Sequence, residues 1–119
     1  MTSAPSQVLG QERAVLRAFL ELPVAVGVLD RDLRFIAINE ALSAMNGLPV
    51  EEHLGRRGPE ILPEVDAGAW EAFRSVIETG ASSIVLVRGR THASSVDGAW
   101  QEELHPWRDP ATGEILGVI

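Results

Sequence analysis

The segment from Pro23 to Pro63 constrains the fold of this 119-residue chain more than any other stretch. Residues 24–29 are all apolar apart from one glycine, a pattern typical of a strand that is covered on both faces. Asp30 and Asp32 then predict a tight reversal, because Asp side chains readily bond the backbone of their own turn. The apolar residues that follow Leu33 predict the returning strand. A β-hairpin therefore begins the predicted domain.

A short helix with a defined start and end is predicted directly after this hairpin. Asn39 suits the N-cap, because its side chain can accept a hydrogen bond from a free backbone N–H group. Leu42 and Met45 place apolar groups on one helix face, and Gly47 suits the left-handed residue that follows the last turn. Gly55 lies beyond a second, acidic turn. Local chemistry thus limits this helix to about two turns.

The order and spacing of four turn and cap residues resemble the marks of the PAS family of sensory domains: Asp30, Asn39, Gly47 and Gly55. The resemblance covers roughly Leu22 to Ile119. It implies an α+β fold, in which a five-stranded antiparallel sheet carries its helices on one face. It also implies that the first strand lies centrally, between the second strand and the last.

The remaining pattern agrees with that order of elements. The clearest helix is predicted from Asp66, a suitable N-cap, to Thr79, with Gly80 as a C-terminal stop. Two short Pro- and Gly-bounded turns precede it. Three strands are predicted after it, separated by a loop rich in Gly, Ser and Thr and by a Pro-containing turn: residues 82–88, 99–108 and 114–119.

An amphipathic helix is predicted before the hairpin and ends near Glu21, because the residue before Pro23 avoids helical backbone. We therefore assign residues 1–21 to an N-terminal tail and helix, and residues 22–119 to the PAS domain. This helix either caps the sheet of its own domain or pairs with a second copy of the chain, and the two roles are compatible. The apolar residues expected at that contact are Val8, Val15, Leu16 and Phe19.

Composition restricts the classes of partner and setting. The net charge of −7 argues against nucleic acid as a partner, because phosphate backbones require clustered basic residues. All ten basic residues are Arg, a bias typical of GC-rich bacteria. No apolar run approaches the roughly twenty residues that cross a bilayer, and the first residues lack the pattern of a signal peptide. The sequence therefore predicts a cytoplasmic protein without a membrane segment.

The cofactors of known PAS domains can be tested against single positions. Flavin-binding members that form a cysteine adduct carry Cys where this chain has Gly58, and the chain contains no cysteine, so that adduct is excluded. Haem-binding members commonly ligate iron through a His on the long helix, whereas residues 66–79 contain none. Glu103 and His105 share a predicted strand face without a third ligand, so no metal site is predicted. Flavin bound without an adduct stays open but has no motif in its favour, and the remaining options are an apolar small molecule or no ligand.

The PAS resemblance places a ligand cavity between the helices and the inner face of the sheet. The strand residues that line it depend on register, because a slip of one residue exchanges the two faces. Trp100 and Trp107 lie on opposite faces of one predicted strand, so one of them faces away from the helices. The candidate lining residues are Val26, Ile36, Met45, Leu54, Ile61, Trp70, Phe73, Ile77, Val85, Leu104 and Trp107.

Arg56 and Arg57 could hold an anionic ligand at the mouth of that cavity, since the planar guanidinium suits carboxylates and phosphates. The alternative is a surface pair that offsets the neighbouring acidic residues.

Together these features predict a bacterial PAS module that is not itself an enzyme. We expect a homodimer that senses a small molecule or a partner and regulates a fused output domain. Residues 39–63 look most like PAS domains fused to metal-dependent phosphatases or to histidine kinases of two-component systems. Because Ile119 ends the chain within an apolar strand, we expect a fragment of a longer protein.

Two alternatives to this prediction remain open. One is a protein-interaction module with a filled core. The other is a small cone-shaped α+β enzyme of the ketosteroid-isomerase type, which needs a carboxylate with a raised pKa in its cavity.

Overall fold

The computed structural model describes residues 5–119, with side chains from Gln11 onward except those of Glu12 and Leu16. Its helices are α1 (Pro5–Leu20), α2 (Glu40–Asn46), the 3-10 helix η1 (Val50–Glu52), α3 (Gly58–Ile61) and α4 (Ala67–Thr79). Its strands are β1 (Gly27–Asp30), β2 (Phe35–Ile38), β3 (Ser83–Gly89), β4 (Gly98–Leu104), β5 (Pro106–Arg108) and β6 (Ile115–Val118). The predicted α+β class is confirmed.

The strands form two antiparallel groups that are joined end to end. One group has the order β2-β1-β6-β5, and the other pairs β3 with β4. The predicted central position of the first strand is therefore confirmed. The expected single strand over residues 99–108 is instead divided between β4 and β5, with His105 between them.

His105 connects the two groups. Its N–H donates to the carbonyl of Ile119 at 3.0 Å, and its carbonyl accepts from the Ile119 N–H at 2.8 Å. Pro106, the next residue, has no N–H to donate to a ladder. The chain therefore leaves its pairing with β3 and continues beside β6, so that six short strands stand where five were expected.

The hairpin of β1 and β2 closes by the chemistry that the sequence predicts. The Asp30 carboxylate accepts from the N–H of Asp32 at 2.9 Å and from the N–H of Arg34 at 3.0 Å. Leu33 adopts the left-handed conformation, with φ of +64°, and its side chain is buried. Strand β1 is shorter than predicted, because residues 24–26 lie outside the ladder and lead into it from α1.

Helix α2 is fixed at both ends. The side chain of Asn39 accepts from the N–H of Leu42 at 3.0 Å, as expected of an N-cap. Gly47 ends the helix in the left-handed conformation, with φ of +71°. A Cβ atom at Gly47 would collide with the backbone N of Ala93, so the loop between β3 and β4 lies directly against this end of α2.

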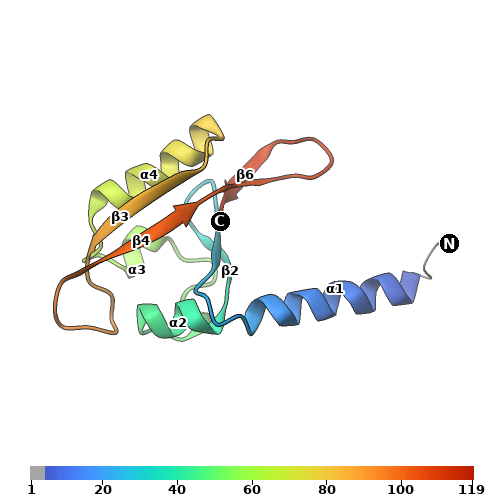
Figure 1. Ribbon diagram of the computed structural model, residues 1–119, viewed down its shortest axis with the longest axis horizontal. Coiled ribbons are helices and arrows are strands. Elements are labelled where there is room, and N and C mark those ends of the chain that lie inside the picture. Colours follow the sequence, from blue (N-terminus) through green and yellow to red (C-terminus); the bar gives the residue numbers. More distant parts are fainter. Residues whose placement is uncertain (1–4) are drawn as a thin grey trace.

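Helix α4 supplies one side of the core. The Asp66 carboxylate caps it by accepting from the N–H of Gly68 at 3.0 Å, and Gly80 ends it with φ of +72°. Its buried stripe packs against the sheet, and α4 lies along β3 in Figure 1. The buried stripe consists of Ala69, Trp70, Phe73, Val76 and Ile77.

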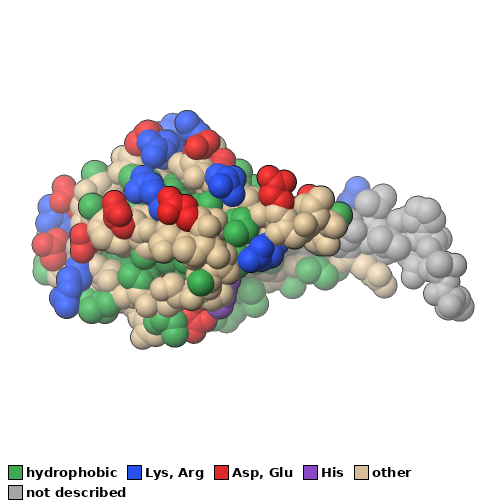
Figure 2. All heavy atoms as spheres, turned by 90° about the horizontal axis from the view of Figure 1, so that it is seen from above, with side chains coloured by type: hydrophobic (Ala, Val, Ile, Leu, Met, Phe, Trp, Pro, Cys, Tyr) green, Lys and Arg blue, Asp and Glu red, His purple; other side chains and the backbone are tan. Residues whose placement is uncertain are grey.

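Acidic and basic side chains alternate over the face of the molecule seen in Figure 2.

Helix α1 extends away from the domain, as Figure 1 shows. Val15 is 70% exposed, and Phe19, nearer the domain, is half-buried. The side chains of Val8 and Leu16 lie outside the described residues. In the part of the chain that the structure describes, no helix is long and apolar enough to cross a membrane.

Candidate functional site

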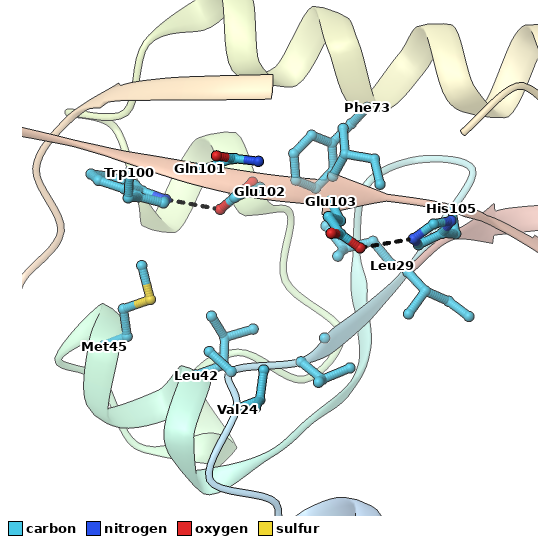
Figure 3. A pocket seen from close by; sticks show the side chains of 15 residues that line it. Val24, Leu29, Leu42, Met45, Phe73, Trp100, Gln101, Glu102, Glu103 and His105 are labelled. Atoms are coloured by element: carbon cyan, nitrogen blue, oxygen red, sulfur yellow. Dashed lines mark hydrogen bonds and ion pairs between the residues drawn. The ribbon is translucent and has the colours of Figure 1, made fainter. Parts of the chain in front are cut away.

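A cavity of about 500 Å³ lies between β4, α2 and the segment that leads into β1. Figure 3 shows Trp100 and Glu102 on β4, facing Met45 and Leu42 on α2 across this space. Phe73 of α4 and Val24 contribute further apolar wall. The volume lies within the range typical of small-molecule sites, which are mostly apolar with a few polar groups.

Asn39 holds the wall formed by the segment before β1. In addition to capping α2, its side-chain oxygen accepts from the Val26 N–H at 3.0 Å, and its amide group donates to the Val24 carbonyl at 2.6 Å. Asn39 itself is fully buried. One side chain thus fixes two walls of the cavity relative to each other.

Gly27 allows these two walls to approach closely. A Cβ atom at this position would lie 2.7 Å from the Leu42 side chain of α2, which is shorter than real carbon contacts. A larger residue would push α2 away from β1 or fill the cavity, since Gly27 belongs to its lining.

The residues of β4 alternate between the two faces of the sheet. Trp100, Glu102 and Leu104 are buried or half-buried and line the cavity. Gln101 and Glu103, which alternate with them, are exposed. This period of two is the normal consequence of strand geometry, and it brings a carboxyl group into a largely apolar space.

Glu102 is the polar group that lies deepest among these apolar side chains. Its Oε1 atom accepts a hydrogen bond from the indole N–H of Trp100 at 3.0 Å. Burial raises the pKa of the Glu102 carboxyl above its ordinary value, because a low-polarity surrounding disfavours the charged form, while the Trp100 hydrogen bond acts in the opposite direction. A carboxyl of this kind is a recognised mark of functional sites.

A second polar pair lies at the rim of the cavity. The Glu103 carboxylate is 3.5 Å from Nε2 of His105, and both side chains are more than half exposed. The Nδ1 atom of His105 is 2.9 Å from the Ser82 hydroxyl. Within the described residues, no group of three or more His, Cys, Asp or Glu side chains is placed to hold a metal ion.

The structure brings four of the predicted lining residues to the cavity: Val26, Met45, Phe73 and Leu104. Ile36 and Leu54 were expected there but lie outside it, 47% and 45% exposed. A register shift between Val28 and Leu29 sets Phe35 opposite Leu29 and turns Phe35, not Ile36, into the core. The prediction of an inward Ile36 was therefore one residue out of register.

The other five candidates do not line this cavity, and four of them lie in or beside the core. Trp70 and Ile77 are buried in the main hydrophobic cluster, and Ile61 and Val85 pack against it. Trp107 is half-buried in β5, opposite Gly117 of β6. Of the two tryptophans of the predicted strand, Trp100 is therefore the one that lines the cavity.

Arg56 and Arg57 are absent from the cavity lining. Arg57 instead donates through Nε to the Asp32 carbonyl at 3.1 Å and lies 3.5 Å from the Glu60 carboxylate. Arg56 is exposed. These contacts connect α3 to the hairpin turn, and they agree with the surface alternative for the arginine pair.

Sequence reasoning missed Leu42, Trp100 and Glu102 as lining residues. A signal for the last two was present, because Leu104 was expected to face inward and a strand repeats its faces every second residue. Trp100 and Glu102 follow from Leu104 by that rule. Glu102 lies between Trp100 and Leu104 on this face of the strand, so the sequence alone could have predicted a carboxyl group in the cavity.

Comparison with known proteins agrees with this architecture. The family model described as PAS fold matches residues 19–119, so the chain belongs to this family and the predicted PAS domain is confirmed. The solved PAS domain of an HTR-like protein from Haloarcula marismortui, 20% identical, covers 95% of this chain and is itself covered to 92%, with a TM-score of 0.71. Family and fold together make this chain a PAS domain. No curated protein matches it.

Two similar structures come from larger receptors. The Vibrio cholerae VqmA dimer is 31% identical over 89% of this chain, with a TM-score of 0.71, and the chain spans 48% of that protein. An RNA-binding Light-Oxygen-Voltage receptor is 25% identical over 97% of this chain, with a TM-score of 0.76, and the chain spans 33% of it.

These receptors correct the expectation that nucleic acid is excluded. A structure of VqmA with a ligand and DNA is 30% identical to this chain, and the Light-Oxygen-Voltage receptor binds RNA. The expectation that nucleic acid is excluded was based on the net charge of this chain alone. Because this chain matches less than half of each of these proteins, its own charge does not decide what such a protein binds.

Proposed function

We propose that the cavity between β4 and α2 binds a small molecule, and that this binding regulates an output domain of the same protein. The cavity itself carries the proposal, because about 500 Å³ of largely apolar space beside Trp100 and Phe73 lies in the range of small-molecule sites. A similar structure supports it: VqmA bound to DPO is 30% identical over 89% of this chain and has a TM-score of 0.71. The chain spans 54% of that protein.

Native mass spectrometry of the purified chain, before and after denaturation, tests the binding. We expect an added mass that is lost on denaturation. In a Met45→Trp variant, the larger side chain occupies part of the cavity and the added mass should decrease. Ile84→Trp is the matched control, because Ile84 lies on β3 away from the cavity and is 64% exposed. A ligand-free wild type that also binds nothing from a cell extract would favour the interaction module.

The output domain is proposed on two grounds. The sequence of residues 39–63 resembles PAS domains that are fused to a phosphatase or to a histidine kinase of a bacterial two-component system, and this favours one of these two outputs. VqmA and the RNA-binding receptor add an output that binds nucleic acid. In all of these cases the domain would be a non-catalytic, cytoplasmic regulator. These output types can be distinguished in the full-length protein. Its kinase activity, phosphatase activity and nucleic-acid binding are measured with and without the small molecule identified by native mass spectrometry.

We also propose that α1 pairs with a second copy of the chain. The helix leaves the domain, and Val15 exposes an apolar side chain along it. An apolar residue in that position is stabilised if a second helix covers it. Helix pairing would connect the sensory domain to a partner, which gives a bound ligand a route to the output.

Glu102 supports a second candidate function. The ketosteroid-isomerase type of enzyme requires a carboxyl with a raised pKa in an apolar cavity, and Glu102 meets that condition. The order of elements and the family favour the sensor. Deuterium exchange at the α-carbon of a small cyclic ketone distinguishes the two: an enzyme would accelerate it in wild type and lose the effect in Glu102→Gln, whereas a sensor would not accelerate it.

A further inference from the structure

The ionisable side chains of the cavity lining are mainly acidic. Its titratable lining residues are Glu102, Glu103 and His105, and none of its fifteen lining residues is Arg or Lys. The chain as a whole carries a net charge of −7. A ligand with a carboxylate or phosphate group would therefore find no Arg or Lys and only the imidazole of His105, which already lies beside Glu103, whereas a positively charged ligand would find the carboxyl group of Glu102.

The deep carboxyl group is held in position for a ligand. The indole N–H of Trp100 donates to Oε1 of Glu102 at 3.0 Å, which fixes the carboxyl plane relative to the strand. Among the hydrogen bonds of the described residues, Oε2 of Glu102 accepts none from a protein donor. Glu102 points from β4 into the space that faces Met45 and Leu42, as Figure 3 shows.

One aromatic side chain contacts this carboxyl group, and a second lines the same cavity. Trp100 and Phe73 both line the same cavity as Glu102. The faces of such rings attract cations, and the attraction increases when water is excluded. The remaining wall is formed by Leu42, Met45, Val24 and Val26, which suit an apolar body.

We propose that the ligand of this cavity is a small organic amine that binds as its ammonium ion, with the charged head on Glu102 and an apolar body against α2. This inference rests on the proposed function and specifies its ligand class. The ammonium group would donate to the free Oε2 atom and lie against the ring of Trp100. It would also supply the opposite charge that the buried carboxylate lacks, since burial alone disfavours its ionised form.

A series of three probes with one aromatic body tests the charge of the head group. The probes are 2-phenylethylamine, 2-phenylethanol and 3-phenylpropionate, and binding is measured by calorimetry and by saturation-transfer NMR at about pH 8, where an alkylammonium stays protonated. We expect the amine to bind about tenfold more tightly than the alcohol, the scale of one hydrogen bond to a charged group. The carboxylate should bind most weakly.

The Glu102→Gln variant tests the proposed partner. Gln keeps the size of the side chain and an oxygen that accepts from Trp100, but it removes the charge. The amine should lose its tenfold advantage in this variant, while the affinity for the alcohol should stay the same. Glu71→Gln is the control for net charge, because Glu71 is exposed on α4 and is not in the cavity lining. It should leave all three affinities unchanged.

The outcomes separate this inference from the proposed function. If the alcohol binds and the amine has no advantage, or if the advantage survives in Glu102→Gln, the amine class is wrong and small-molecule binding stands. If the carboxylate binds most tightly, the electrostatic argument is overturned. If none of the probes binds, the inference fails, and the mass measurement above decides separately whether the cavity takes any small molecule.

Discussion

At the scale of single residues, the two buried amide side chains next to α2 have different roles. Asn39 is fully buried and satisfies the N–H of Leu42, the N–H of Val26 and the carbonyl of Val24. Asn46, at the other end of the helix, donates through Nδ2 to Nε2 of His53 at 3.1 Å. Asn39 therefore holds the cavity wall, whereas Asn46 connects the end of α2 to the buried side chain of His53.

We predict that Asn39→Ala lowers the free energy of unfolding by about 2 kcal/mol or more. Loss of an N-cap costs about 1 kcal/mol, and a buried donor left without a partner adds at least as much. Asn39→Asp keeps the accepting oxygen, but it places a buried carboxylate against the Val24 carbonyl, so it should also lower the stability. Urea unfolding of the three proteins measures the difference. Equal stability of Asn39→Ala and wild type would contradict the role given to this side chain.

Glu102 predicts a pH dependence of stability. Its pKa is raised in the folded protein, so the folded state binds this proton more readily than the unfolded state does. The associated stability is present at low pH and is lost as pH rises through the raised pKa. Glu103 and His105 are the other ionisable side chains of the cavity lining, whereas Asn46 and Thr91 of the smaller adjoining pocket carry no charge.

The measurement compares urea unfolding of wild type and Glu102→Gln over a series of pH values. We expect wild type to lose stability relative to the variant as pH rises from the acid side toward neutrality. Because Glu103 and His105 are present in both proteins, their contribution cancels in the difference. A difference that stays constant over this range, or one of opposite sign, would show that burial does not raise the pKa of Glu102.

At the scale of elements, the end of α2 is fixed against the loop between β3 and β4. Gly47 has a φ of +71°, and a Cβ atom there would collide with the backbone of Ala93. We predict that Gly47→Ala lowers the free energy of unfolding by about 1 to 3 kcal/mol, through backbone strain and displacement of the loop. Gly98→Ala is the control, because nothing lies within 4 Å of its Cβ position. Similar losses in both variants would contradict this contact.

The elements also show how far the sequence could predict the structure. Asp30, Asn39 and Gly47 act through their own turns, so local chemistry was enough to place them. The inward face of β2 depends on an irregularity in its pairing with β1, which skips Ile36, and nothing in the sequence of residues 35–38 marks this irregularity. Strand parity with Leu104 could place Glu102 on the inner face of β4, but the cavity that it enters depends on α2 lying opposite β4, and that contact is tertiary.

At the scale of the whole molecule, few interactions join α1 to the domain among the residues whose side chains the structure describes. The Asn39 amide group lies 3.5 Å from the Phe19 carbonyl, at the limit of a hydrogen bond, while the main hydrophobic cluster contains residues from Leu29 onward. A chain lacking residues 1–21 should therefore fold with little change in unfolding temperature. The contacts that hold the cavity together lie within residues 22–119.

If α1 instead makes its main contacts with a second copy, the truncation should convert a dimer into a monomer without unfolding it. Sedimentation velocity measures the first effect and thermal unfolding the second. Val15→Glu should weaken the dimer in the full chain, because it places a charge where an apolar contact is proposed. Ala14→Glu, at an exposed neighbouring position, is its matched control. A truncated chain that remains dimeric would place the pairing surface on the sheet and not on the helix.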